Sequence, residues 1–400
     1  MKRSFCWFIF LIPMMLNAGT PDKTAEGNNR FAFGLFHELT GNPGQTILFS
    51  PFSISTALAM TYGGARDETA RQMSVAMNFS RGEDFHSSFR KMISRINEGT
   101  EGNVRLDMAN GLWAQRDFSF LPSYFDQVKS DYHAELRNVD FTDPAERKKC
   151  MAEINGWVEH ATNNRIRDLL SPGDLNPFTR LVLVNAIYFL GDWDEPFAKE
   201  STSPKDFFPE AGTRVRVPFM NRHGRYGYCE DAGIRVIEIP YRGNSASMVI
   251  FLPDSVNGTA GFEQSFDFDR YLALTALLQP AEVRLSLPKF RATSKTRLKD
   301  TLSKMGMPIA FSTDLADFSG MTGKPNLCIS EVIHQAFIEA DEKGTEAAAA
   351  TAVVMRTMAA RPSPDMKVFN AYHPFIFCIK DNATGTILFM GKIMDPSVAK

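Results

Sequence analysis

The spacing of apolar residues predicts mostly helices early in the chain and mostly strands later. Phe31, Leu35 and Leu39 recur at helical spacing, and residues 52–62 are apolar almost all round, which is typical of a buried helix. Further helices are predicted over 67–77, 84–96, 145–164 and 295–305. Apolar runs and apolar–polar alternation predict strands over 47–49, 106–113, 180–189, 214–220, 226–228, 235–240, 247–252, 282–287, 331–339, 375–379 and 386–392. This order predicts the α+β class in one domain, residues 19–400.

Polar side chains interrupt three of the most apolar elements. Ser53 and Thr56 lie in the predicted buried helix, Asn185 lies in the strand over 180–189, and His334 lies in the alternating strand over 331–339. Buried polar groups need hydrogen-bond partners, so these four side chains could satisfy one another in a network. A lone histidine in an apolar strand is more often such a core residue than a catalyst.

The segment 339–364 combines small residues with an alternating pattern. At a strand period of two, Thr345, Ala347, Ala349 and Thr351 fall on one uncharged face, while the opposite face carries Glu346 and Arg356. Its flanks, 341–344 and the proline-broken 361–364, are typical of exposed loop. Alanine-rich sequence also favours helix, so its conformation stays open. A strand-competent segment held outside a sheet would be a stored conformational transition.

Composition and charge are those of an ordinary globular protein. Hydrophobic residues make up 44%, charged residues 22%, and 33 phenylalanines predict a large core. The net charge of −2 carries no strong basic field, so nucleic acid is not expected as a partner. Arg90, Lys91 and Arg95 form a small basic cluster for which polyanion binding stays open, although a solvated helix face is the preferred interpretation.

The N-terminus has the pattern of a secretory signal peptide. Lys2 and Arg3 precede an apolar run over 5–16, and small residues follow near Ala18. The run is shorter than the ~20 residues of a spanning helix, and no later segment is long and apolar enough to anchor the chain. We therefore expect a signal peptide over 1–18 and a secreted, extracellular protein (periplasmic in a bacterium) with no membrane partner. Sequons occur at Asn78, Asn257 and Asn382 and matter only if the host glycosylates.

Cysteine usage indicates neither a disulfide framework nor a metal site. One of the five cysteines lies in the leader, and the others, widely spaced and without a CxxC pair, are Cys150, Cys229, Cys328 and Cys378. Four buried or half-buried thiols are the preferred interpretation, although one disulfide would be compatible with an oxidising compartment.

Motifs that would indicate an enzyme are missing. There is no GxSxG elbow, HExxH pair, P-loop or dinucleotide fingerprint, and the seven histidines are not at metal-ligand spacing. A Ser–His hydrolase was the alternative for the polar residues above, but no acidic third member is evident. We expect no catalytic residue, no metal and no cofactor.

Several ordered motifs resemble the serpin family from about residue 28 to 396. They are FSPFSI at 49–54, INGWV at 154–158, NAIYF at 185–189 with Trp193, DFSGM at 317–321, EKGTEAAAAT at 342–351, and HPF at 373–375 followed by Gly385 and Gly391. Each motif alone is moderate evidence, whereas their joint order is specific. Thr56 stands where the family usually has serine, which keeps the hydroxyl group.

The resemblance implies a fold, a mechanism and site residues. The implied fold has three sheets, about nine helices and an exposed reactive-centre loop at about 342–366. The implied activity is suicide inhibition: a protease cleaves the loop, and insertion of the hinge 344–352 into the main sheet traps the acyl-enzyme. Hinge residues would be Glu342, Gly344, Thr345, Ala347, Ala349 and Thr351. By the same resemblance, Ser53, Thr56, Asn185 and His334 form a polar cluster where the sheet opens, and Trp193 is the aromatic at the loop's entry.

Two bonds compete as the cleavage site. Family spacing from Glu342 indicates Met358–Ala359, which favours an elastase-like or chymotrypsin-like extracellular serine protease. Arg356–Thr357 is the alternative and would select a trypsin-like enzyme. A non-inhibitory relative acting as carrier, chaperone or substrate is the second functional hypothesis, although such proteins carry charged or bulky hinge residues and the inward face here has none. A monomer is expected.

Overall fold

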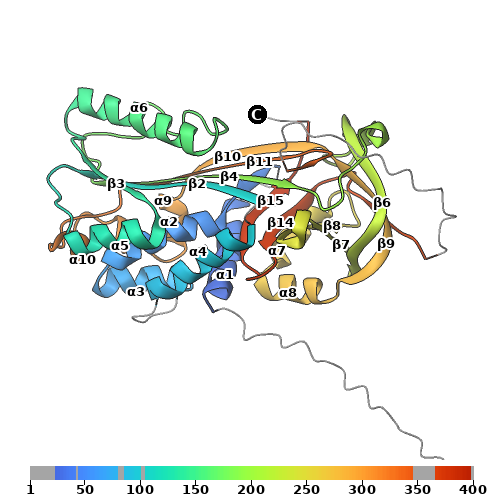
Figure 1. Cartoon of the computed structure of the whole chain (residues 1–400), viewed down its shortest axis with the longest axis horizontal. Helices are drawn as coiled ribbons and strands as arrows, with labels where there is room; N and C mark the ends of the chain where they lie inside the picture. Colours follow the sequence, from blue (N-terminus) through green and yellow to red (C-terminus); the bar gives the residue numbers. More distant parts are fainter. Residues whose placement is uncertain (1–22, 42–43, 80–84, 101–103, 346–364, 398–400) are drawn as a thin grey trace, which may run out of the picture.

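The computed structural model describes residues 23–41, 44–79, 85–100, 104–345 and 365–397, which fold into a mixed α+β architecture (Figure 1). The predicted signal peptide and the bonds Met358–Ala359 and Arg356–Thr357 lie outside these residues. The α-helices are α1 (Lys23–Leu39), α2 (Pro51–Gly64), α3 (Asp67–Ala76), α4 (Phe85–Thr100), α5 (Pro122–Tyr132), α6 (Pro144–Ala161), α7 (Gly258–Ser265), α8 (Phe268–Ala276), α9 (Lys299–Lys304) and α10 (Ser319–Thr322). Short 3-10 turns are η1 (Lys199–Ser201), η2 (Arg242–Asn244) and η3 (Pro308–Phe311).

The strands form two hydrogen-bonded sheets within the described ranges. They are β1 (Ile47–Phe49), β2 (Val104–Gln115), β3 (Glu135–Val139), β4 (Leu181–Asp192), β5 (Ser203–Phe207), β6 (Val215–Asp231), β7 (Ile234–Pro240), β8 (Ala246–Pro253), β9 (Gln279–Pro288), β10 (Phe290–Arg297), β11 (Glu331–Ala340), β12 (Gly344–Thr345), β13 (Lys367–Asn370), β14 (Phe375–Asp381) and β15 (Ile387–Ile393). The nine-stranded sheet has the order β1-β15-β14-β8-β7-β6-β9-β13, with β5 also paired to β6. The six-stranded sheet has the order β10-β11-β12-β4-β2-β3.

The fold class is confirmed, but the described strands join into two sheets where three were expected. Strand β6 is the physical reason, because its 17 residues are shared among three partners. Its first part pairs with β5, its middle with β9 and its last five residues with β7. Backbone hydrogen bonds to β6 therefore connect two groups of strands into one sheet. The first group is β7, β8, β14, β15 and β1, and the second is β5, β9 and β13.

The predicted helix over 295–305 is wrong in its first turn. Lys295 and Arg297 lie in β10, where they pair with Gln335 and Ile333 of β11, and α9 covers only Lys299–Lys304. Local preferences of such residues are weak, so the long ladder to β11 decides their conformation. For the same reason the strands predicted over 214–220 and 226–228 are parts of the continuous β6, which pairs with β9 across the join.

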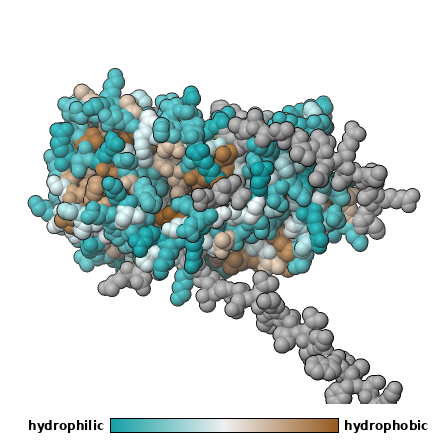
Figure 2. Space-filling view, viewed as in Figure 1, coloured by the Kyte–Doolittle hydropathy of each residue, from teal (hydrophilic) through white to brown (hydrophobic). Residues whose placement is uncertain are grey.

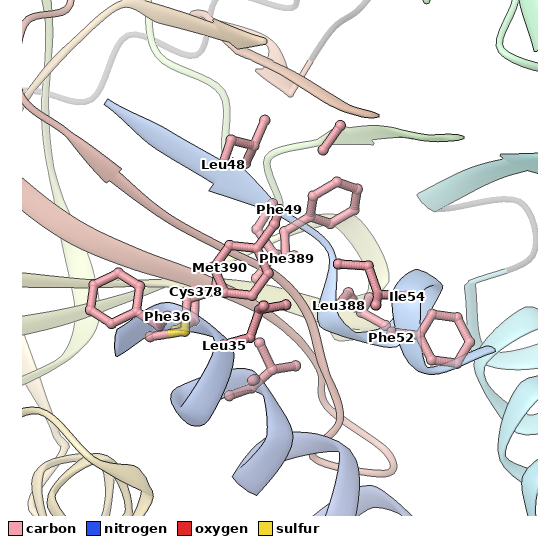
Figure 3. Packing of buried hydrophobic residues seen from close by; sticks show 14 of the residues in the cluster. Leu35, Phe36, Leu48, Phe49, Phe52, Ile54, Cys378, Leu388, Phe389 and Met390 are labelled. Atoms are coloured by element: carbon pink, nitrogen blue, oxygen red, sulfur yellow. The ribbon is translucent and has the colours of Figure 1, made fainter. Parts of the chain in front are cut away.

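The main core lies where α1 and α2 pack against the nine-stranded sheet. Figure 3 shows side chains of α1, β1, α2 and β15 pointing into one apolar cluster, with Phe36, Phe49 and Phe52 fully buried within it. Helix α2 begins as its sequence predicts: the Ser50 hydroxyl accepts the Ser53 N–H, and Pro51 occupies the first turn. Because α2 is buried almost all round, its hydroxyl side chains lie inside the protein.

A second core lies between α6 and the six-stranded sheet. Ile154 and Val158 of α6 are fully buried with Val184 and Ile333 of the sheet, and α6 crosses that face in Figure 1. Trp113 of β2 and Trp157 of α6 meet edge-to-face with ring centroids 5.2 Å apart. The six-stranded sheet is therefore covered by helices on both faces, which explains why β4 is apolar at almost every position.

The exterior is mostly hydrophilic on the face shown in Figure 2. None of the described helices combines the length and apolar character that crossing a membrane requires. Cys150, Cys229, Cys328 and Cys378 are buried free thiols, as the preferred interpretation predicted.

Candidate functional site

At one end of the six-stranded sheet, the short strand β12 lies between the two central strands β4 and β11. Strands β4 and β11 pair directly, in parallel, from Val182–Glu331 to Tyr188–Phe337. Beyond that stretch β12 lies between them: Thr345 pairs with Gly191 of β4 and with Ala340 of β11, antiparallel to both. The chain thus reverses after β11 and re-enters the sheet beside the strand it has just left.

The reversal after β11 is built from Asp341 and Gly344. The Asp341 carboxylate accepts the backbone N–H groups of Lys343 (2.9 Å) and Gly344 (3.2 Å), a side-chain turn typical of aspartate. The Asp341 N–H donates to the Gly344 carbonyl at 2.8 Å. A Cβ at Gly344 would lie 2.1 Å from the Gly191 carbonyl oxygen, so only glycine fits between the strands here.

Two stacked aromatic rings lie against the entering hinge. Thr345 is fully buried, and its hydroxyl shares a 2.8 Å hydrogen bond with the Tyr241 hydroxyl. The Tyr241 ring stacks on Trp193 with centroids 4.7 Å apart, and Trp193 Nε1 donates to the Asp341 carbonyl at 2.9 Å. Burial raises the pKa of Tyr241, so its hydroxyl stays protonated. Trp193 therefore contacts both the turn after β11 and the ring that binds Thr345.

Tyr241 is a site residue that the sequence analysis did not identify. It follows the strand β7 and precedes a turn, a position with no motif. Its neighbours in the site, Trp193 and Thr345, are far away in sequence. An isolated β-bridge joins Tyr241 to Trp193, and the pairing of β12 with β4 brings Thr345 to them.

An ion pair between the buried Glu342 and the half-buried Lys289 holds the turn after β11. The Glu342 carboxylate binds Lys289 Nζ at 2.8 Å and accepts the Thr202 hydroxyl at 2.9 Å, while the residue is only 6% exposed. Burial alone would raise the pKa of Glu342, but the hydrogen bonds from Lys289 and Thr202 hold it below its ordinary value. The carboxylate thus stays charged and anchors the turn that leads into β12.

A polar network lies deeper between the same strands. Asn185 of β4 and His334 of β11 are register partners, and His334 Nδ1 hydrogen-bonds Asn185 Oδ1. Asn185 Nδ2 reaches Ser53 Oγ at 2.5 Å and also Asn110 Oδ1, which belongs to the next strand, β2. All of these side chains are buried. The network ties α2, β2, β4 and β11 together in the middle of the direct pairing of β4 with β11.

Thr56 was expected in the polar network but lies outside it, and two other groups take part in its place. Its hydroxyl donates to the Phe52 carbonyl at 2.8 Å, one turn back in α2, rather than to the network. A threonine on a helix commonly makes this local bond. Asn110 and the Ser50 N–H, which the sequence analysis missed, take part instead. Asn110 could have been identified as a polar residue inside the predicted apolar strand over 106–113.

Burial keeps His334 neutral. It lowers the pKa of His334 to about 3, because a charged imidazolium would lose its hydration in a site without an acid. Ser50 N–H donates to Nε2 at 3.1 Å, so the ring proton sits on Nδ1 and is donated to Asn185. Both ring nitrogens of His334 are thus hydrogen-bonded to Ser50 N–H and Asn185, and among the described residues neither bonds to a serine hydroxyl.

The predicted hinge continues beyond Thr345. Ala347, Ala349 and Thr351 lie outside the described residues, as do both candidate cleavage bonds. Within the described ranges no group of three or more His, Cys, Asp and Glu side chains is arranged to hold a metal ion.

Comparisons with known proteins match nearly the whole chain. The family described as "Serpin (serine protease inhibitor)" matches residues 26–396. A leukocyte elastase inhibitor of Xenopus tropicalis is 40% identical over 382 residues, covering 94% of this chain and all of that protein. The structure of uncleaved ovalbumin is 29% identical with a TM-score of 0.84, and covers 94% of this chain and all of the other. Human thyroxine-binding globulin in complex with its ligand is 30% identical with a TM-score of 0.84, over 94% of this chain and 98% of the other.

Proposed function

Because the chain belongs to the serpin family, we propose that it is a suicide inhibitor of serine proteases that works by hinge insertion. The observation that carries this proposal is the position of Gly344 and Thr345 between β4 and β11. The first two residues of an inserted strand already have their place in the sheet. Insertion after cleavage would extend a pairing that has begun rather than create a new one.

The residues that follow Thr345 have side chains compatible with insertion between β4 and β11. Continuing at a strand period of two, Ala347, Ala349 and Thr351 would face the same side as Thr345, which is fully buried, and none of them is charged or bulky. About 15 residues at ~3.3 Å each would carry the cleaved end roughly 50 Å along the sheet. Each added ladder hydrogen bond contributes a net ~1 kcal/mol, so complete insertion is strongly favourable.

The direct pairing of β4 with β11 is what insertion has to break. Seven register pairs join these strands, and the pair of His334 with Asn185 lies in the middle of them. An inserted strand would replace parallel pairing on one side by antiparallel pairing on both sides, which is slightly stronger per residue. The protease displaced by that movement would lose the alignment of its oxyanion hole, and the acyl-enzyme would persist.

Met358–Ala359 is the bond that we propose the protease cuts. Met358 lies 16 residues beyond Glu342, the residue that the Lys289 pair fixes at the base of the hinge. An unbranched apolar side chain suits the primary pocket of an elastase-like or chymotrypsin-like protease. The similarity to a protein named leukocyte elastase inhibitor supports an elastase-like target. Arg356–Thr357 remains the alternative, for a trypsin-like enzyme.

Incubation with purified serine proteases tests this proposal. We expect an elastase-like or chymotrypsin-like protease to form a covalent complex that survives denaturing electrophoresis, and mass spectrometry of the released peptide to begin at Ala359. A peptide beginning at Thr357 would move the cleavage site to Arg356. If every protease nicks the loop and stays active, the inhibitory mechanism is wrong and the second candidate below takes its place.

The second candidate is a non-inhibitory member of the family that acts as carrier, chaperone or substrate. The similarity to a thyroxine-binding globulin solved with its ligand is the observation in its favour. Against it stand the uncharged alternate residues Thr345, Ala347, Ala349 and Thr351 of the hinge and the glycine that permits entry at 344. Simple cleavage without complex formation is the result that distinguishes it.

Secretion is a separate proposal, which rests on the basic, apolar and small-residue pattern of 1–18. Expression of the full chain in a secreting host should release protein whose N-terminus, read by mass spectrometry, begins near Gly19. Changing Leu11 to Arg interrupts the apolar run and should retain the protein in cells. Release of an uncleaved chain with Met1 intact would contradict the leader.

A further inference from the structure

A cationic cavity of about 560 Å³ opens on the solvent-facing side of the nine-stranded sheet. Strand β9 alternates there: Val283 and Leu285 point into the core while Arg284 is exposed. Register places His223 of β6 opposite Arg284, and Asn221 opposite Ser286. The lining includes no carboxylate, and its polar members are chiefly Lys205, Asn221, Arg222, His223, Arg284 and Ser286.

The floor of this cavity is a fixed polar arrangement. Asn221 Nδ2 donates to the backbone carbonyls of Ser201 (2.7 Å) and Phe219 (2.9 Å), which orients its Oδ1 toward Lys205 Nζ at 2.5 Å. Lys205 Nζ also donates to Ser286 Oγ at 2.9 Å. An ammonium group has three N–H donors, so one donor of Lys205 is left over after these two bonds.

Only part of the positive charge in the cavity is balanced by acids. Arg222 pairs with Glu195, and His223 Nε2 lies 3.2 Å from Glu282 Oε2, so these two side chains have acidic partners. Among the described residues, by contrast, Lys205 and Arg284 form no ion pair. Burial, followed by the positive charge of Arg284, lowers the pKa of Lys205. Two neighbouring cations without a counter-ion repel each other, and a bound anion would remove that repulsion.

The cavity lies near the turn after β11 and near β13. Ser201 in its lining precedes Thr202, whose hydroxyl binds Glu342 in that turn. Asn370, also in the lining, belongs to β13. The cavity is therefore connected through Thr202 to the turn that leads into β12.

We propose that this cavity is an anion subsite that takes a single phosphate, sulfate or carboxylate group. Lys205 supplies its remaining N–H, and Arg284 supplies a guanidinium that matches the planar or tetrahedral oxygens of such groups. A free small anion and an acidic side chain of a docking protease share this chemistry. Binding of an acidic side chain of a protease rests on the proposed inhibitory function, whereas binding of a free small anion does not.

Inorganic phosphate, titrated at constant ionic strength, is the probe for the site. We expect phosphate to raise the melting temperature of the wild-type protein, since a ligand that binds only the folded state stabilises it. Arg284→Gln, at an exposed position, and Lys205→Met should each weaken phosphate binding about tenfold, because each removes a charge-assisted hydrogen bond. Arg225→Gln is the matched control, because Arg225 is exposed on β6 but outside the lining, and it should bind like wild type. Equal binding by wild type and Arg284→Gln, or no phosphate effect at all, would overturn the proposal.

A second measurement distinguishes the two sources of the anion. Phosphate is added to the reaction of the inhibitor with pancreatic elastase, and the association rate is followed. If phosphate slows the wild-type reaction and leaves Arg284→Gln unchanged, the subsite also receives an acidic group of the protease. If phosphate binds but leaves the rate unchanged, the occupant is a free anion. The melting experiment stands even if elastase is not inhibited, so failure of the proposed function is visible separately.

Discussion

Thr345→Arg is expected to turn the protein from an inhibitor into a substrate of the same protease. Thr345 is fully buried between β4 and β11 and hydrogen-bonds Tyr241. An arginine would hold residue 345 outside the sheet in the uncleaved protein, because burying an unpaired guanidinium there costs about 3 kcal/mol or more, and insertion would have to overcome that cost. Since 1.4 kcal/mol corresponds to about tenfold in rate, insertion should slow roughly a hundredfold, and the acyl-enzyme is hydrolysed first.

The measurement is the fraction of protease that becomes covalently trapped at equal extents of loop cleavage. Thr345→Ser is the matched control, because it keeps the hydroxyl that faces Tyr241 and should trap the protease as the wild type does. Cleavage of Thr345→Arg at the normal rate shows that the variant is folded and its loop accessible. Undiminished trapping by Thr345→Arg would contradict insertion at this point of the sheet.

Asn185→Leu is expected to cause a large loss of stability in the uncleaved protein. Leucine removes the partner of Ser53, Asn110 and His334 at once, and all three are buried. A buried polar group left without a partner costs about 1–3 kcal/mol, so the total should be about 3 kcal/mol or more. The loss should appear as a lower free energy of unfolding in urea.

Asn326→Leu makes the same change at an exposed position and should alter stability by no more than about 0.5 kcal/mol. Combining Asn185→Leu with His334→Phe provides a second check, because the two residues share one hydrogen bond. The double variant should lose less than the sum of the single losses. Additive losses, or a single loss near that of Asn326→Leu, would show that the network contributes little.

Local sequence patterns predicted the helices and strands whose conformation depends least on partners distant in sequence. The capped, apolar α2 begins at Pro51 after Ser50, and β4 was recognised from its continuous apolar run. Both signals arise from residues close in sequence, through capping and burial on all sides. The same local reasoning failed at Lys295, because the pairing of β10 with β11 outweighed a helical pattern.

The residues of the candidate site likewise divide into those that local patterns predicted and those that only the fold brought together. The sequence determined by itself that polar groups lie inside apolar elements at Ser53, Asn185 and His334, and that the segment after Glu342 carries small, uncharged alternate residues. The tertiary structure alone decided that Asn110 and the Ser50 N–H complete the network and that Tyr241 holds Thr345. It also decided that Gly344 enters between β4 and β11. Burial and the alternation of side chains along a strand depend on residues close in sequence. Hydrogen-bond partners more than 50 residues apart depend instead on strand register and packing, which a local sequence pattern does not specify.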